Sequence, residues 1–203
     1  MLIVVRHGQS TGNERNLLVG RVDLPLTDHG RAQAAALAPA LRGAEVVYSS
    51  PLARAHETAL LAAPHVAPQV DDAFIELSYG SFEERPLADL APSDWAAMAA
   101  DHEAPVAPGG ESLAAVDARV TAALDTLAQD HHDLFTDPHR HVVITTHASP
   151  VKSAVAWAMG VPGTIAWRIR SDNAALTTIT WRLGRPYLLN HNVVPATSAK
   201  LEA

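Results

Sequence analysis

Two stretches of the chain, residues 2–5 and 141–146, consist largely of branched or large apolar residues. Such runs are typical of strands that are buried on both faces, as in a parallel sheet. A shorter run at 45–48 predicts a third strand. Between 111 and 130, by contrast, apolar residues recur at intervals of three and four, which predicts an amphipathic helix. The pattern therefore predicts an α/β protein.

Capping signals predict where other helices begin and end. Thr27 is a suitable N-cap for a helix that runs to about residue 37, and Pro39 ends its regular part. Ser49-Ser50-Pro51 predicts that a serine-capped helix starts directly after the strand before it. Ala148-Ser149-Pro150 predicts a helix from 148 to about 159, closed by a glycine and a proline.

The remaining segments give weaker signals. The part from 80 to 110 is rich in alanine and proline, and we expect it to form a cap or lid over a pocket, within a single domain of residues 1–203. The other predictions are a strand at 70–74, a helix at 93–100, a hairpin of strands 175–182 and 186–190 at the sheet edge, and irregular segments at 13–23, 131–141 and 193–203.

The composition is that of a soluble globular protein, with 48% hydrophobic and 18% charged residues. No run approaches the roughly 18 apolar residues of a membrane helix. Residues 1–5 contain no basic stretch, which disfavours a cleaved signal peptide, and the absence of cysteine fits a cytoplasmic protein. A net charge of −7 argues against general nucleic-acid binding, so a local group of arginines is all the more informative.

Chemically active side chains follow the predicted strands. Arg6 and His7 come directly after the first strand, Arg54 follows the second, and His147 follows the third. Glu76 lies in a loop that would overhang them. Because the carboxyl ends of parallel strands meet at one edge of the sheet, we expect these side chains to gather around one anion.

These residue types suit phosphoryl transfer. Guanidinium groups bind phosphate oxygens with forked donors, and a neutral imidazole can attack phosphorus. Cationic neighbours help to keep that imidazole neutral, and a carboxylic acid can protonate the leaving alcohol. The structural alternative is that His7 merely ends a strand and Arg6 pairs with a carboxylate. Glu83 or Glu84 could also take the role of Glu76.

A set of short motifs runs in order from residue 3 to about residue 160. It comprises Arg6-His7-Gly8, Asn13, Gly20, Pro25-Leu26-Thr27 with Gly30, Ser50-Pro51-Leu52 with Arg54-Ala55 and Thr58-Ala59, Glu76 with Gly80, Gly110-Glu111-Ser112, and His147. The set resembles the histidine phosphatase superfamily, in the branch that holds cofactor-dependent phosphoglycerate mutases and small bacterial phosphatases. The resemblance implies a three-layer α/β/α sandwich around a mainly parallel sheet.

The resemblance also implies roles for single residues. His7 matches the family's nucleophile, which forms a phosphohistidine, and Glu76 matches the proton donor to the leaving group and later base for water. The main-chain N–H of Ala148, at a helix start, could add an anion contact. Family members need no metal, and we expect no cofactor. The residues that match the phosphate pocket are Arg6, Asn13, Arg54 and His147.

Three places depart from the family pattern. Leu17 and Val19 stand where many relatives have an arginine and a glutamine, so we expect the substrate beyond the phosphate to be less polar. Ala148-Ser149-Pro150 replaces the commoner glycine pair after the second histidine. Phe82-Glu83-Glu84 replaces the usual tryptophan-glutamate-glycine, which changes the details of the lid.

Three functions fit these residues. The first is a phosphatase that hydrolyses a small phosphate ester, the second is a phosphoglycerate mutase-type enzyme that returns the group to another hydroxyl, and the third is a non-catalytic phosphate-binding protein. The short span from Glu76 to Gly110 favours the phosphatase by analogy with the family. Sugar phosphates, phosphoglycerate derivatives, a cobalamin-precursor phosphate, phosphoserine and phosphotyrosine proteins all fit as substrates. We expect no nucleic-acid or membrane partner, and the edge hairpin allows a homodimer.

Four histidines near the third strand invite a metal interpretation. They are His131, His132, His139 and His141. Their spacing is not that of helical metal ligands and no second shell is evident, so a solvated loop is the preferred interpretation.

Overall fold

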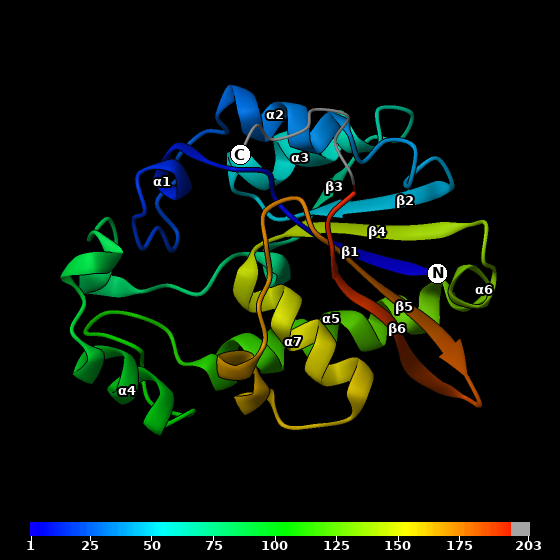
Figure 1. Cartoon of the computed structure of the whole chain (residues 1–203). Helices are drawn as coiled ribbons and strands as arrows, with labels where there is room; N and C mark the ends of the chain where they lie inside the picture. Colours follow the sequence, from blue (N-terminus) through cyan, green and yellow to red (C-terminus); the bar gives the residue numbers. More distant parts are fainter. Residues whose placement is uncertain (196–203) are drawn as a thin grey trace.

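A six-stranded sheet divides the molecule in the computed structural model, which describes residues 1–195 (Figure 1). The strand order is β3-β2-β4-β1-β5-β6. The pairs among β1 to β4 are parallel, whereas β5 pairs antiparallel with both β1 and β6. The strands are β1 Leu2–Arg6, β2 Ala44–Ser49, β3 Gln69–Val70, β4 His141–Thr146, β5 Leu176–Arg182 and β6 Arg185–Val193. This sheet confirms the predicted α/β fold with a mainly parallel sheet.

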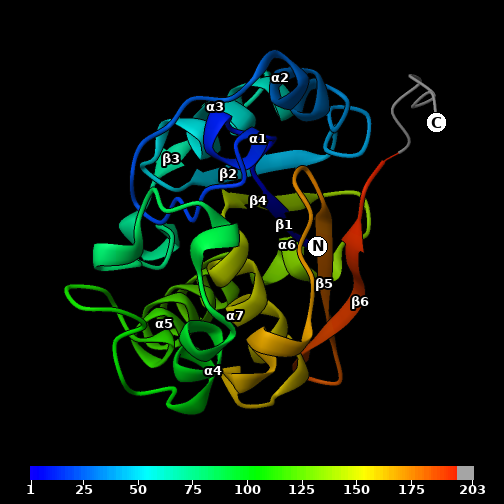
Figure 2. The ribbon, with the colours of Figure 1, turned by 60° about the vertical axis from the view of Figure 1, so that its left-hand side comes forward.

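Helices cover both faces of the sheet (Figures 1 and 2). On one face lie α2 (Asp28–Ala35) and α3 (Ala53–Ala62), and on the other lie α5 (Leu113–Asp130), α6 (His132–Thr136) and α7 (Ala148–Met159). Alternate residues of β1 belong to two separate cores, because successive side chains of a strand point to opposite faces. Leu2 and Val4 belong to the core that contains the α5 stripe, whereas Ile3 and Val5 pack in the other. Covering both faces explains why residues 2–5 of β1 are all apolar.

The register of the parallel strands brings their ends to one level. Arg6 at the end of β1 pairs with Thr146 at the end of β4, and Ser49 at the end of β2 pairs with Thr145. One residue further on, His7 N–H donates to the main-chain oxygen of Thr146 at 2.9 Å. The segments that follow β1, β2 and β4 therefore leave the sheet side by side.

The capping predictions are confirmed for two helices and wrong for a third. Thr27 caps α2 by accepting from Gly30 N–H at 3.0 Å, and α7 ends at Gly160 in the left-handed conformation, with φ of 64°. The helix after β2, however, begins only at Ala53, and no serine caps it. The Ser50 hydroxyl turns instead toward His147. The tertiary contact therefore outweighs the local capping preference.

Other boundaries differ in detail from the predictions. The strand expected at 70–74 is limited to β3, because the Asp71 side chain accepts from Ala73 N–H and turns the chain into a short 3₁₀ helix, Asp72–Phe74. A short helix, α6, occurs in a segment expected to be irregular, and another, α1 (Thr11–Glu14), overlaps the first two residues of the segment expected to be irregular at 13–23. The edge hairpin of β5 and β6 is confirmed, although β6 extends to Val193, and residues 196–203 of the expected tail lie outside the described residues.

The segment expected to be a lid lies at the end of the sheet toward which β1 runs (Figure 1). It contains 3₁₀ helices at Gly80–Phe82 and Leu87–Asp89, followed by α4 (Pro92–Ala100). Main-chain hydrogen bonds tie it to residues 16–18, since Leu18 N–H donates to Arg85 and Leu87 N–H donates to Asn16. Its function as a lid of a single domain stays a prediction.

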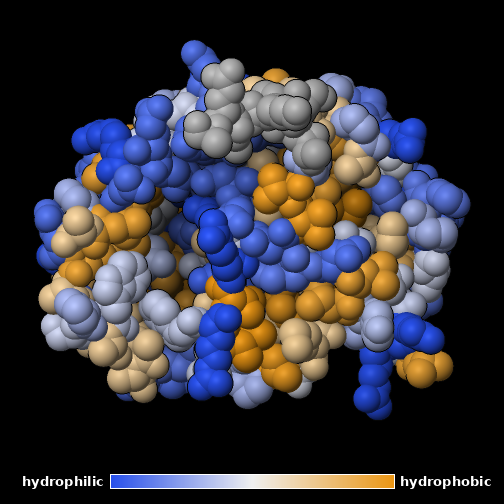
Figure 3. Space-filling view, viewed as in Figure 1, coloured by the Kyte–Doolittle hydropathy of each residue, from blue (hydrophilic) through white to orange (hydrophobic). Residues whose placement is uncertain are grey.

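Apolar side chains are also exposed on the edge strand. Tyr187, Leu189 and Val193 of β6 are each 45–46% exposed. Apolar and polar residues are interspersed over the face seen in Figure 3. A homodimer through this edge stays a prediction.

Among residues 1–195, no helix combines the length and the hydrophobicity that crossing a membrane requires.

Candidate active site

His7 follows β1 and is held in a defined orientation. Its side chain is 4% exposed, and its Nδ1 lies 2.6 Å from the main-chain oxygen of Gly8. A carbonyl oxygen can only accept, so Nδ1 carries the proton and Nε2 keeps its lone pair. Arg54 Nε lies 3.3 Å from this Nε2. Nε2 therefore accepts a hydrogen bond from Arg54, and its lone pair becomes available to attack phosphorus once this N–H donates to the phosphate instead.

The surroundings of the two histidines keep both rings uncharged. Burial, followed by the charges of Arg54 and Arg6, lowers the pKa of His7 well below its ordinary range. Burial is also the largest cause of the strongly lowered pKa of His147, and Arg54 is the second. An uncharged imidazole has the lone pair that nucleophilic attack requires.

His147 comes from the neighbouring strand and meets His7. The centroids of the two rings lie 5.1 Å apart. The Nε2 atom of His147 hydrogen-bonds Ser50 Oγ at 2.7 Å, whereas its buried Nδ1 has no partner within residues 1–195. Ser50 Oγ also accepts from Leu52 N–H, so the arrangement lets the hydroxyl donate to Nε2 and leaves the ring proton on Nδ1. Nδ1–H is then a donor for a phosphate oxygen.

The two predicted arginines converge on the same place. Arg54, in the first turn of α3, is 1% exposed, and its Nη atoms donate to the main-chain oxygens of Gly20 (2.7 Å) and Val22 (2.8 Å). Arg6 donates through Nη1 to the main-chain oxygen of Ser171. Its buried Nε is unpaired among the residues that the structure describes. Main-chain oxygens thus fix both guanidiniums while leaving N–H groups for an anion.

The carboxylate of Glu76 is positioned by main-chain N–H groups. Oε1 accepts from Leu77 at 2.8 Å and from Ser149 at 3.1 Å, and Oε2 accepts from Ala148 at 3.1 Å. The N-terminus of α7 therefore binds this carboxylate. Ala148 N–H, which we predicted to contact the anion, would have to exchange Glu76 for phosphate to do so.

Asn13 is oriented by three donors. Its Oδ1 accepts from Ser10 N–H, from Ser10 Oγ and from Asn173 Nδ2, at 3.0–3.1 Å. With the oxygen so engaged, the Nδ2 group is the part of the amide that can donate to a ligand. Asn13 lines the same cavity as His7.

Sequence reasoning missed several residues that support the site. Asn173 also donates to the main-chain oxygens of His7 (3.1 Å) and Gly8 (3.4 Å), but it precedes the edge hairpin and no spacing links it to the motifs. Glu111, the first residue of the helix expected at 111–130, pairs with Arg21 and Arg119. The one sequence feature that could have pointed to a role for Glu111 in the site is its place in the family motif Gly110-Glu111-Ser112.

The predicted residues surround one small cavity of about 160 Å³. Arg6, His7, Asn13, Arg54, Glu76 and Ala148 line one part of it. Leu17, Leu18, Val19, Leu87 and Tyr79 line much of the remainder. His147, fully buried, packs against His7. All of the predicted site residues therefore lie at one place, although their roles stay predictions.

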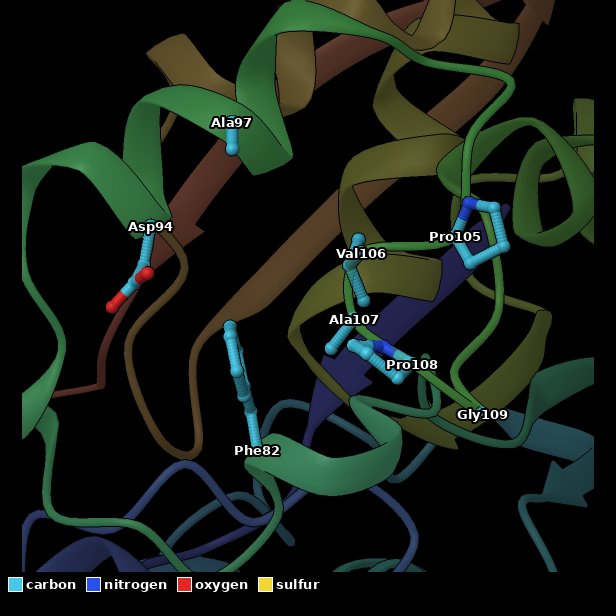
Figure 4. A pocket seen from close by; sticks show the side chains of 8 residues that line it. All are labelled: Phe82, Asp94, Ala97, Pro105, Val106, Ala107, Pro108 and Gly109. Carbon is cyan, nitrogen blue, oxygen red and sulfur yellow. The ribbon is translucent and has the colours of Figure 1, made fainter.

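A second cavity, of about 400 Å³, lies within the segment expected to be a lid (Figure 4). The Phe82 side chain rises between α4 and the segment 105–109. Its lining is largely apolar, and the one acidic group, Asp94, accepts from Ala91 N–H at 2.9 Å to cap α4. This cavity shares no lining residue with the candidate active site.

The four histidines considered as metal ligands do not gather. His131 Nε2 bonds the Tyr48 hydroxyl at 3.3 Å, and His141 Nε2 bonds the main-chain oxygen of Pro138 at 3.3 Å. Within residues 1–195, no three His, Cys, Asp or Glu side chains lie close enough together to hold a metal ion.

The sequence profile of the histidine phosphatase superfamily, branch 1, matches residues 2–194. The chain therefore belongs to this superfamily, and it is a phosphatase, a hydrolase of phosphate monoesters, by class. The fold and the convergence of two histidines and two arginines agree with that membership.

Several proteins similar to this chain are named as phosphatases. Phosphoserine phosphatase 1 of Hydrogenobacter thermophilus is 30% identical over 95% of this chain and 92% of its own length. The adenosylcobalamin/alpha-ribazole phosphatase of Escherichia coli is 26% identical over 88% of each chain. Mycobacterial glucosyl-3-phosphoglycerate phosphatase, solved with VO₃, superposes with a TM-score of 0.84 at 27% identity, covering 94% of this chain and 98% of its own. A phosphoserine phosphatase of Entamoeba histolytica, 23% identical over 96% and 97% of the two chains, shares the fold with a TM-score of 0.84.

Proposed function

We propose that the protein hydrolyses a small phosphorylated metabolite without a metal ion, through a phosphohistidine on His7. The observation that carries this proposal is the single cavity that His7, Arg54 and Glu76 share. It holds a nucleophile, a phosphate-binding cation and an acid–base group, which are the three parts that the reaction needs.

In the first step, the lone pair of His7 Nε2 attacks phosphorus while the bond from phosphorus to the leaving oxygen breaks. Arg6, Arg54, Asn13 and the Nδ1–H of His147 bind the phosphoryl oxygens as their charge redistributes. The carboxylic acid of Glu76 gives its proton to the leaving oxygen, so that a neutral alcohol departs.

In the second step, water attacks the phosphohistidine. The Glu76 carboxylate accepts a proton from the water as the new bond to phosphorus forms. The bond from phosphorus to Nε2 breaks, and its electron pair returns to the imidazole. Inorganic phosphate leaves, and both residues regain their starting forms.

A metal-free assay tests the proposal. With EDTA present, the protein is expected to hydrolyse p-nitrophenyl phosphate, and His7→Gln is expected to abolish turnover. Quenching the reaction with denaturant at alkaline pH should trap a base-stable, acid-labile phosphoryl label in the wild type and not in His7→Gln. His29→Gln, at an exposed position on α2, is the matched control and should retain both.

Two other outcomes would replace the proposal. Conversion of 3-phosphoglycerate to 2-phosphoglycerate would assign a mutase, and phosphate binding without any turnover would assign a non-catalytic binder. Label that persists in His7→Gln would show that another residue is the nucleophile. The cytoplasmic location stays a proposal that rests on the absence of cysteine.

A further inference from the structure

The candidate cavity has two unlike parts. Besides the phosphate-binding residues, its lining includes the apolar residues Leu17, Leu18, Val19 and Leu87, which we call the apolar wall. The first three are 7–8% exposed, whereas Leu87 is 38% exposed. The wall therefore combines three buried residues with one, Leu87, that reaches the molecular surface.

The backbone of this wall is also largely unable to bind a charged substrate group. Three of its four N–H groups already donate to other main-chain oxygens. Leu17 donates to Gly12 at 2.9 Å, Leu18 to Arg85 at 2.9 Å, and Leu87 to Asn16 at 2.8 Å. A carboxylate placed against the wall would lose its hydration and gain none of these donors.

Apart from Arg6 and Arg54, which the proposed function assigns to the phosphate, the polar side chains that line the cavity carry no positive charge. Glu76 is itself acidic and lines the same cavity. Burial raises the pKa of the Tyr79 phenol far above its ordinary range, so this ring stays uncharged. Lys152, one turn along α7 from Ala148, is not among the described residues that line the cavity.

We propose that this enzyme prefers phosphate esters whose alcohol is uncharged and apolar where it meets the wall, and that it discriminates against alcohols bearing a carboxylate there. The inference rests on the proposed function, because it concerns the leaving group of that same reaction. The apolar wall disfavours a substrate carboxylate by removing its hydration.

Two esters of matched shape test the inference. Propyl phosphate and 3-phosphooxypropanoate differ only in the exchange of a methyl group for a carboxylate. We expect kcat/KM to be higher for propyl phosphate by about tenfold or more. An equal or reversed preference, with p-nitrophenyl phosphate still hydrolysed through His7, would overturn the inference and leave the proposed function intact. If no ester is hydrolysed at all, the proposed function fails and the inference fails with it.

Variants that introduce a charge test whether the apolar wall causes the preference between the two esters. Leu17→Arg introduces a cation into the wall and should shift the preference toward the carboxylate ester by about tenfold. Leu87→Arg, at the exposed rim, is the second variant and avoids a charge in the interior. Leu60→Arg, on α3 where Leu60 is 48% exposed, is the matched control and should not change the preference. If neither wall variant changes the ratio of the two kcat/KM values, the wall does not determine specificity.

Discussion

Arg21 Nε donates a hydrogen bond to the main-chain oxygen of Glu76 at 3.0 Å. Arg119 Nη2 approaches the same oxygen at 3.4 Å. The Glu111 carboxylate lies between these arginines and accepts from Arg21 at 2.9 Å and from Arg119 at 3.2 Å. Two arginines held by one carboxylate therefore fix the backbone of the candidate acid–base residue, which makes Glu111 a positioning residue.

We predict that Glu111→Gln lowers kcat/KM for propyl phosphate by about tenfold and leaves kcat/KM for p-nitrophenyl phosphate nearly unchanged. Loss of the charge loosens both arginines and displaces Glu76. An alkoxide leaves only with a proton, whereas p-nitrophenolate leaves without one. The measurement is kcat/KM for both esters, because this constant reports the steps up to release of the alcohol.

The control for this prediction is Glu45→Gln. Glu45 forms an exposed ion pair with Arg140, at 2.7 and 2.8 Å, on another part of the molecule. Its loss should affect neither ester. Equal losses on both esters in Glu111→Gln would show that Glu111 supports the fold and not the acid.

Ser50→Ala should weaken phosphate binding. Without the hydroxyl, the buried Nε2 of His147 loses its 2.7 Å partner and the ring is no longer held with the proton on Nδ1. A buried hydrogen bond is worth about 1 kcal/mol, so we expect the inhibition constant for inorganic phosphate to rise several-fold. Ser93→Ala, at an exposed site on α4, is the control. Unchanged inhibition in Ser50→Ala would contradict the assignment of the ring proton.

Asn13→Asp should abolish most activity although it preserves shape. The three donors around Oδ1 can still bind a carboxylate oxygen, so the fold is expected to remain intact. The second oxygen, however, replaces the Nδ2 donor and repels the phosphate. We expect kcat/KM for p-nitrophenyl phosphate to fall by about a hundredfold. Activity within twofold of the wild type would exclude Asn13 as a phosphate ligand.

Stability should fall in mild acid because of the two site histidines. The pKa of each is lowered in the folded state from the ordinary 6.5, so below that pH the unfolded chain binds protons that the folded chain does not. The free energy of unfolding is therefore highest above pH 6.5 and decreases as the pH falls toward the folded pKa values. Together, His7 and His147 can change the free energy of unfolding by up to roughly 2.5 kcal/mol per pH unit.

Urea denaturation between pH 7.5 and pH 5 measures this slope. In the double variant His7→Gln, His147→Gln the slope should be much smaller, since no buried imidazole then remains in the site. A slope that is the same in both proteins would show that other groups cause the acid sensitivity.

Local signals in the sequence determined much of the fold. The continuous apolar runs of β1 and β4 identified strands with two covered faces, and the spacing of apolar residues identified α5. Arg6, His7, Arg54 and His147 could be found because each follows a strand, and parallel strands end at the same edge. These are properties of short segments and of a topology that such segments strongly favour.

The contacts between distant segments were decided only by the tertiary structure. Ser50 has the local signature of a helix cap, yet its hydroxyl binds His147, because the register of β2 and β4 brings the two together. Glu111 appears in the sequence as a helix-start residue, and only packing places it between Arg21 and Arg119. Side-chain partners far apart in sequence depend on how elements pack in three dimensions, and the spacing of residues along one chain does not encode that packing.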